Sequence, residues 1–170
     1  MEFKLTNCVL RPWRAEDAES LAFHANNPNI ACNLRDGFPS PYTLENARQW
    51  LQISMNDERN FLFVIDVAGN AVGGIGIIPK DDVYRLSAEI GYWLSEDYWN
   101  RGIMTEAVTA LVNWAFKHLQ TIRIYAGIFE KNKKSMKVLE KAGFRLEAIH
   151  HKAVIKNNEI MDEYIYAILK

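Results

Sequence analysis

The sequence predicts an α/β fold: a twisted, mostly antiparallel mixed sheet of about seven strands, with a parallel central pair and helices on both faces. Two observations lead to this prediction. Apolar residues recur with a helical period from Val108 to Leu119, which indicates a helix over 101–118 with one buried face. The segments 86–94 and 122–129 on either side of it have strand character, and strands joined by a helix are expected to be parallel neighbours.

The N-terminal part is expected to contain one strand and two helices. Residues 3–13 alternate loosely and predict the first strand, and 15–25 follow as a helix with acidic residues in its early turns. The stretch 26–42 contains three prolines and a glycine, which favour an irregular segment of the kind that often lines sites. A helix over 44–55 comes next, with Thr43 as its N-cap.

The middle of the chain changes to a strand pattern. Residues 61–67 and 71–78 are apolar runs separated by Ala68-Gly69-Asn70, a combination that predicts a β-hairpin. The strand over 86–94 then ends at the polar Ser95-Glu96-Asp97. A helix follows it after only a short turn.

The C-terminal part begins with 122–129, a nearly continuous apolar run that is typical of a buried central strand. A short helix is predicted over 132–142, capped by its first residue and followed by Gly143 in the C′ position. Residues 144–149 and 160–169 are expected to form a closing antiparallel pair. The predicted order is strand, two helices, three strands, helix, strand, helix and two strands.

Composition places the chain among ordinary globular proteins. It has 170 residues, 49% of them hydrophobic, and a formal net charge of −1 at pH 7, so we expect one domain over 1–170. A basic excess typical of nucleic-acid binding is absent, as is an apolar run of the roughly 20 residues that a membrane span needs. With no signal peptide either, we expect a cytoplasmic protein in which Cys8 and Cys32 are reduced. An acylated Cys32 is the less favoured alternative.

The junction between the strand over 86–94 and the helix over 101–118 is the candidate ligand site. The first turn of a helix offers unpaired N–H groups and the positive end of the helix dipole, which suit phosphate oxygens. Gly102 has no side chain where a ligand would approach the backbone, and Arg101 adds a charged donor. The sequence contains neither a Walker loop nor a GxGxxG fingerprint here.

The segment Trp99-Asn100-Arg101-Gly102-Ile103-Met104 resembles motif A of the GNAT superfamily of acetyltransferases, Q/R-x-x-G-x-G/A. Trp99 departs from the Gln/Arg position and Met104 from the second small residue. The flanking Ala-Glu-Ile-Gly-Tyr-Trp-Leu and Thr-Glu-Ala stretches match, and 132–144 is similar to motif B. The likeness is greatest to the branch that contains ribosomal-protein N-terminal acetyltransferases, and it extends over nearly the whole chain.

The resemblance implies acetyl-CoA as cosubstrate, with no metal. It also implies a bulge at Gly91 that separates this strand from its parallel neighbour and makes room for the pantetheine arm. The residues expected to contact the cofactor are Tyr92, Trp93 and Leu94 through their backbone, Trp99, Asn100, Arg101, Gly102, Ile103, Met104 and Thr105 at the pyrophosphate, and Asn132, Ser135 and Lys137 in motif B. Lys137 belongs to a run of lysines for which a solvated charged face is the alternative interpretation.

Two residues are candidate catalytic groups. Glu89 is the only acid in an apolar strand and is a candidate general base, acting directly or through a water; the alternative is an ion pair with a cation such as Arg85. Ser135 is the nearest hydroxyl for the CoA thiolate, because the family's tyrosine position falls on Leu139. The alternative for Ser135 is a serine on the helix surface.

The resemblance places the acceptor pocket at the segments 33–38 and 84–85. The residues expected to bind the acceptor are Asn33, Arg35, Phe38 and Tyr84, together with Glu89. The predicted function is direct transfer of an acetyl group to a primary amine, either a protein N-terminus or a small molecule. The alternative is a non-catalytic acyl-CoA sensor on the same fold. No nucleic acid or membrane is expected as a partner, and the protein is expected to be a monomer or homodimer.

Overall fold

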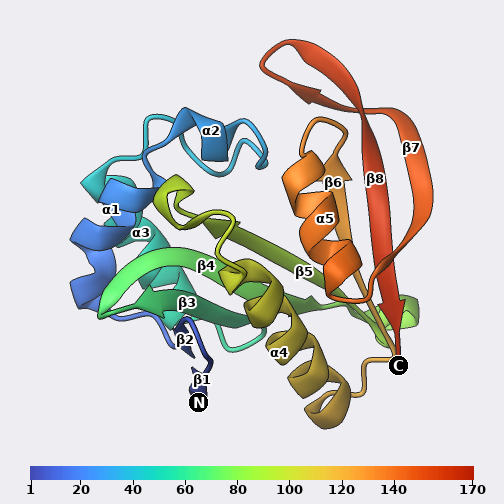
Figure 1. Cartoon of the computed structure of the whole chain (residues 1–170), viewed down its shortest axis with the longest axis horizontal. Coiled ribbons are helices and arrows are strands. Elements are labelled where there is room, and N and C mark those ends of the chain that lie inside the picture. The colour runs from blue at the N-terminus through green and yellow to red at the C-terminus, as the bar shows by residue number, and fades with distance from the viewer.

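The computed structural model describes all 170 residues and contains one eight-stranded sheet with the order β1-β2-β3-β4-β5-β6-β8-β7. The predicted fold class is confirmed, with eight strands in place of about seven (Figure 1). The strands are β1 (Phe3–Lys4), β2 (Val9–Arg11), β3 (Phe61–Val67), β4 (Asn70–Pro79), β5 (Ser87–Leu94), β6 (Arg123–Phe129), β7 (Arg145–Lys156) and β8 (Glu159–Leu169). The helices are α1 (Ala18–Ala25), α2 (Pro28–Ala31), α3 (Leu44–Met55), α4 (Ile103–His118) and α5 (Lys133–Lys141).

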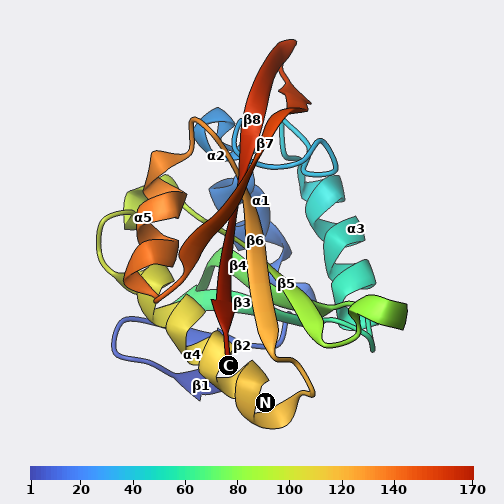
Figure 2. The same cartoon turned by 90° about the vertical axis from the view of Figure 1, so that its right-hand side faces the viewer.

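Helices cover both faces of the sheet, as predicted. One core cluster joins the sheet to α4 and α5, through residues such as Val108 and Leu139, and a smaller cluster joins it to α1 and α3, through Leu21 and Leu51. Figure 2 shows α4 and α5 on one side of the strands and α3 on the other. None of the helices is long and apolar enough to cross a membrane.

The extra strand arises at the N-terminus, where the prediction of one strand over 3–13 is wrong. β1 and β2 are an antiparallel pair joined by a tight turn. The backbone N–H groups of Thr6 and Asn7 donate to the carboxylate of Glu106, at 2.6 and 3.2 Å. The side chain of Glu106 therefore stabilises the turn between β1 and β2. The chain reverses its direction there, where the sequence suggested a continuous strand.

The parallel pair β5 and β6 is short, and this shortness positions the site. Only Ser87–Glu89 pair with Arg123–Tyr125, after which the two strands fan apart (Figure 1). β6 pairs with β8 over its whole length, and β5 stays with β4 in an unbroken register that includes Gly91 opposite Gly76. The separation is confirmed, but the expected bulge at Gly91 is absent from the β4–β5 ladder. The two strands part because each follows its other neighbour.

The C-terminal half follows the prediction closely except for the length of one strand. The side chain of Asn132 accepts a hydrogen bond from the N–H of Ser135 at 3.2 Å, and Gly143 has a φ of 92° after α5. β7 continues to Lys156 and not to residue 149, because its hairpin with β8 turns at Asn157-Asn158. Both asparagines have positive φ, as a tight hairpin turn requires. Within the predicted irregular segment 26–42, α2 forms one helical turn.

Candidate active site

The first turn of α4 has backbone donors without partners, and it begins at the exposed Gly102. Gly102 is its N-cap with a φ of 78°, a conformation that favours glycine, and no atom lies within 4 Å of the position that a Cβ would take. The first N–H group with a partner in the helix is that of Glu106, which donates to the Gly102 carbonyl at 3.1 Å. The N–H groups before it are free to bind an anion.

A surface cavity of about 490 Å³ starts at this helix end. Gly102, Thr105, Glu106, Thr109 and Ala110 line it from α4, and Lys141 lines it from α5. Its volume is in the range of small-molecule sites. Two charged side chains line the cavity. The carboxylate of Glu106 is already hydrogen-bonded to the turn between β1 and β2, which leaves Lys141 as the charged side chain available to a ligand.

The side chains of motif A are used partly for packing. Ile103 and Met104 are both buried in the main core cluster. Their side chains therefore pack in the core, and only their backbone N–H groups are available to a ligand at the start of α4. Met104, which replaces a small residue of the family pattern, therefore does not fill the space beside Gly102. Asn100 contributes a positive φ of 62° to the turn.

Trp99 and Arg101 fasten the loop before α4. The indole N–H of Trp99 donates to the Leu94 carbonyl at 2.8 Å, and the ammonium of Lys134 lies 4.2 Å from its ring centroid. The guanidinium of Arg101 lies 5.2 Å from the ring centroid of Tyr98. Arg101 is exposed beside Gly102, whereas Trp99 joins the loop to β5 and α5.

The backbone of β5 beyond Glu89 has one edge without a neighbouring strand. The N–H of Ser95 donates to the Val72 carbonyl at 2.8 Å, and Leu94 lies opposite Gly73. Because antiparallel bonds alternate along a strand, Trp93 bonds to β4, while Tyr92 and Leu94 direct their backbone groups toward the side of β6. The carbonyl of Leu94 accepts from Trp99, so Tyr92 has the freest backbone of the three predicted pantetheine contacts.

Glu89 is ion-paired on both of its oxygens. Arg35 Nη2 lies 2.6 Å from Oε1, and Lys80 Nζ lies 2.7 Å from Oε2. Arg85, the partner suggested by the sequence, bonds instead to the Asp82 carbonyl at 3.0 Å. Burial acts to lower the pKa of Lys80, but its bond to Glu89 and the charge of that carboxylate outweigh it, and the pKa is raised.

The structure brings two of the predicted acceptor residues to the Glu89 face of the sheet. Arg35 contacts Glu89 directly, and Phe38 packs against Trp93 with ring centroids 5.7 Å apart. Neither of the other two forms a hydrogen bond or ion pair with Glu89. The amide of Asn33 donates back to the Asn29 carbonyl at 3.0 Å, and Tyr84 is 70% exposed on a 3₁₀ turn.

Ser135 is not on the helix surface; it is only 8% exposed. Its hydroxyl lies 2.7 Å from the hydroxyl of Tyr92. Burial raises the pKa of Tyr92 far above its ordinary value, against a smaller opposite effect of the bond to Ser135. Leu139 is fully buried in the core, and Lys137 is exposed.

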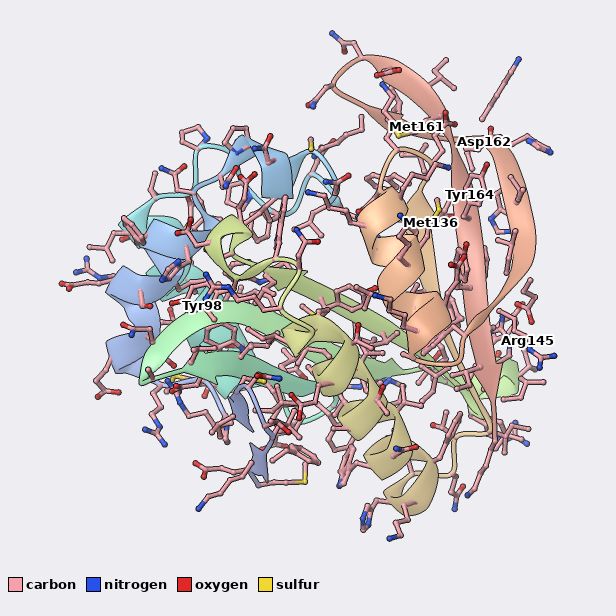
Figure 3. The ribbon with its side chains drawn as sticks, viewed as in Figure 1. Tyr98, Met136, Arg145, Met161, Asp162 and Tyr164 are labelled. Carbon is pink, nitrogen blue, oxygen red and sulfur yellow. The ribbon has the colours of Figure 1, made fainter.

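α5 is held against β8 at its N-terminal end. Tyr164 of β8 lies beside this helix (Figure 3), where the ammonium of Lys133 is 4.8 Å from its ring centroid. The bond between Tyr166 and Glu140, 2.9 Å long, attaches the C-terminal half of the helix to the same strand. These contacts attach both halves of α5 to β8.

Sequence reasoning missed three charged groups on the face of the sheet that carries Glu89. Lys80 pairs with Glu89, and the buried Lys156 pairs with Asp36 at 2.7 Å, beside Arg35. The carboxylate of Glu163 lies over Gly127, in the space where a side chain on that residue would stand. The one signal in the sequence was Gly127 itself, a glycine inside an apolar strand, which often marks a close approach.

The fold and these local features agree with known proteins. Residues 7–145 match the family model described as "Acetyltransferase (GNAT) domain". The "Probable N-acetyltransferase YjcK" of Bacillus subtilis is 36% identical, with 94% of this chain and 92% of that protein covered. The "Uncharacterized N-acetyltransferase YnaD" of the same organism is 39% identical, with 100% and 98% covered.

Among solved structures, a GNAT-family acetyltransferase from Bacillus anthracis superimposes with a TM-score of 0.85 at 27% identity, over 99% of this chain and 98% of that one. The family model alone spans well over half of the residues. This chain therefore belongs to the GNAT family of acetyltransferases and is an acetyl-CoA-dependent N-acetyltransferase.

Proposed function

We propose that this chain transfers the acetyl group of acetyl-CoA directly to a primary amine, on a protein N-terminus or a small molecule. The observation that carries the proposal is the common location of three features where β5 and β6 part. These are the first turn of α4 with its unpaired N–H groups, the ion-paired Glu89 and the hydrogen-bonded pair of Tyr92 and Ser135. The phosphate donor site and the hydroxyl lie on the α4–α5 side of the sheet, and the side chain of Glu89 lies on the opposite face, because side chains alternate along a strand.

The cofactor would be held mainly by backbone groups. The free N–H groups from Gly102 to Thr105 suit the pyrophosphate, because the positive end of the α4 dipole adds to their hydrogen bonds. The cavity that continues to Lys141 suits the nucleotide end of CoA. The exposed cations Arg101 and Lys137 would pair with the phosphate groups of CoA. The unpaired edge of β5 at Tyr92 suits an amide of the pantetheine arm.

On the acceptor side, we assign Glu89 as the general base. An alkyl amine with a pKa near 10.4 is almost wholly protonated at pH 7, whereas an α-amine with a pKa of about 8 is much less so. A base is therefore more important for the first kind of acceptor. The ammonium group of the acceptor would replace Arg35 on Oε1 of Glu89, give up its proton there or through a water, and then attack the thioester carbon.

On the leaving-group side, we assign Ser135 as the donor to the CoA sulfur. Ser135 is buried near the N-terminus of α5. The family's tyrosine position, one turn further along the helix, is taken by the core residue Leu139, which has no hydroxyl to donate. A hydrogen bond to the developing thiolate stabilises charge that is absent in the ground state, and it therefore lowers the barrier.

The alternative drawn from the sequence is a non-catalytic acyl-CoA sensor on the same fold. It is favoured by the ion pairs that occupy both oxygens of Glu89. A cytoplasmic location and a monomeric or homodimeric state are part of the main proposal. Both cysteines are free thiols, as the location requires.

The deciding experiment is an acetyl-transfer assay on the full chain. The protein is incubated with acetyl-CoA and a panel of peptides and small amines, and both free thiol and acceptor mass are followed. The proposal requires free thiol together with an acetylated amine. Tight binding of acetyl-CoA with no acetylated amine across the panel would contradict it and support the sensor.

A further inference from the structure

Tyr92 and Ser135 form a polar pair between β5 and α5, in which Ser135 is buried and Tyr92 is partly buried. Their hydroxyl oxygens are 2.7 Å apart. Tyr92 packs against the main core cluster, to which Met136 and Leu139 of α5 belong. The hydroxyl of Tyr92 also makes a longer contact, 3.4 Å, with the backbone carbonyl of Ser135. The hydroxyl of Ser135 has Tyr92 as its partner, and in such apolar surroundings leaving it unpaired carries a desolvation cost.

The hydroxyl of Ser135 is not needed by its own helix. A serine in the first turn of a helix often bonds to the nearby backbone. Here the amide oxygen of Asn132 already accepts from the N–H of Ser135, at 3.2 Å. The hydroxyl is instead directed to Tyr92, which lies just past Glu89, the last residue of β5 that pairs with β6. The pair therefore borders the point where the strands separate.

Either hydroxyl of the pair can donate to the other, because both are protonated. A phenol in this environment keeps its proton, because burial raises the pKa of Tyr92 well above the ordinary value. When Tyr92 donates to Oγ of Ser135, the hydrogen of Ser135 is left free for another acceptor. A donor to Oγ also polarises the serine O–H and strengthens its own hydrogen bonds.

We propose that Tyr92 is a positioning residue that donates to Oγ of Ser135 and so holds the serine hydroxyl as the hydrogen-bond donor to the sulfur that leaves the thioester. The inference rests on the proposed function. In the transfer, the amine nitrogen bonds to the acetyl carbon, the carbon–sulfur bond breaks, and the electron pair stays on sulfur. Glu89 takes the first proton of the ammonium group before the attack and passes it to solvent, then takes the second proton from the nitrogen as the carbon–sulfur bond breaks. Ser135 and Tyr92 keep their own protons, and CoA leaves as the thiolate.

Steady-state kinetics of four variants test this role. Ser135→Ala is expected to lower kcat about 100-fold, and Tyr92→Phe roughly tenfold, the effect of one hydrogen bond. The double variant should be no slower than Ser135→Ala, because Tyr92 acts only through the serine. Tyr166→Phe is the matched control. It removes another tyrosine bond to α5, at Glu140, and should keep wild-type kcat.

A KM for acetyl-CoA that stays constant across these variants would separate the proposed role from a merely structural one, and Ser135→Thr should restore part of the lost kcat. The proposal is overturned if Tyr92→Phe has wild-type kcat, if its effect lies in KM, or if the losses multiply in the double variant.

A second measurement needs no turnover. CoA bound to the protein is titrated with base while the absorbance of its thiolate is followed. Wild type should ionise the bound thiol at lower pH than Tyr92→Phe, Ser135→Ala or the double variant, and the last two should agree with each other. Equal titration curves for wild type and Tyr92→Phe would refute the role of Tyr92. Absence of acetyl transfer by wild type would refute the proposed function alone.

Discussion

Arg35 and Glu89 are joined by a charged hydrogen bond of 2.6 Å between Nη2 and Oε1. The guanidinium side chain is 75% exposed and the carboxylate side chain only 14%. Arg35 comes from the loop after α2, and the neighbouring Asp36 is paired with the buried Lys156 of β7. We infer that Arg35 occupies the position on Glu89 that an acceptor ammonium group would take, and that the acceptor displaces it.

The first prediction concerns Glu89 as the base. Glu89→Gln keeps the size of the side chain but removes its ability to take a proton, so kcat/KM should fall about 100-fold with an alkyl amine acceptor at pH 7. The loss should be smaller with an α-amine, which is less protonated at this pH. Glu45→Gln, an exposed acid on α3, is the control. Equal losses with both acceptors would argue against a role as base.

The second prediction concerns Arg35 as the displaced group. An ion pair with one exposed partner contributes about 0.2–1 kcal/mol, so Arg35→Ala should lower the KM for the acceptor by up to about fivefold. The KM for acetyl-CoA should not change. Initial rates over a range of acceptor concentrations measure both values. An increase in the acceptor KM would mean that Arg35 binds the acceptor and does not compete with it.

The third prediction concerns the backbone at the start of α4. Gly102 has a φ of 78°, so Gly102→Ala strains the turn by about 1–2 kcal/mol and places a methyl group beside the free N–H groups. The thermal stabilisation by acetyl-CoA should therefore be much smaller than in wild type. Gly37→Ala is a matched control, because Gly37 also has open space around it but no positive φ. Similar behaviour of the two variants would remove Gly102 from the binding site.

The fourth prediction concerns stability. Arg11 is buried and binds both Asp17 and Asp66 at 2.7 Å, and these bonds raise its pKa. Arg11→Leu leaves two shielded carboxylates without a cation, so the free energy of unfolding should fall by about 3–5 kcal/mol. Urea denaturation measures the change. Arg14→Leu, in an exposed pair with Glu2, should change it by less than about 0.5 kcal/mol; a comparable loss there would undermine the explanation.

The fifth prediction concerns thiol reactivity. Burial, and then the charges of Glu106 and Asp66, raise the pKa of Cys8 to about 11. The thiolate is the reactive form, so at pH 8 Cys8 is almost entirely protonated and shielded. Native protein should react with one equivalent of a thiol reagent, at the exposed Cys32, and with a second only after unfolding. Two fast equivalents in native protein would contradict this placement.

The sequence was sufficient for features set by local periodicity and capping. The apolar period that ends at Leu119 identified α4 within two residues at its start, and Asn132 and Gly143 delimited α5 correctly. Such features depend on residues close together in the chain. The mixed sheet was predicted from them, and the family resemblance rested on the motif around Gly102 and on 132–144; both are confirmed.

Contacts between distant segments could not be derived in this way. The break between β1 and β2 depends on Glu106, 99 residues away from Asn7. The partners of Glu89 come from loops at positions 35 and 80, whose conformations have no periodic signal. The same holds for Ser135, a candidate catalytic residue for which the sequence left a surface position as the alternative and which the fold places against Tyr92.

The central claim is that the first turn of α4 binds the pyrophosphate of CoA beside the parting strands β5 and β6. Calorimetric titration of the full, folded chain with acetyl-CoA tests it most directly. We predict heat from one binding site per chain, with a Kd in the micromolar range. The absence of any binding heat at millimolar acetyl-CoA would contradict the claim.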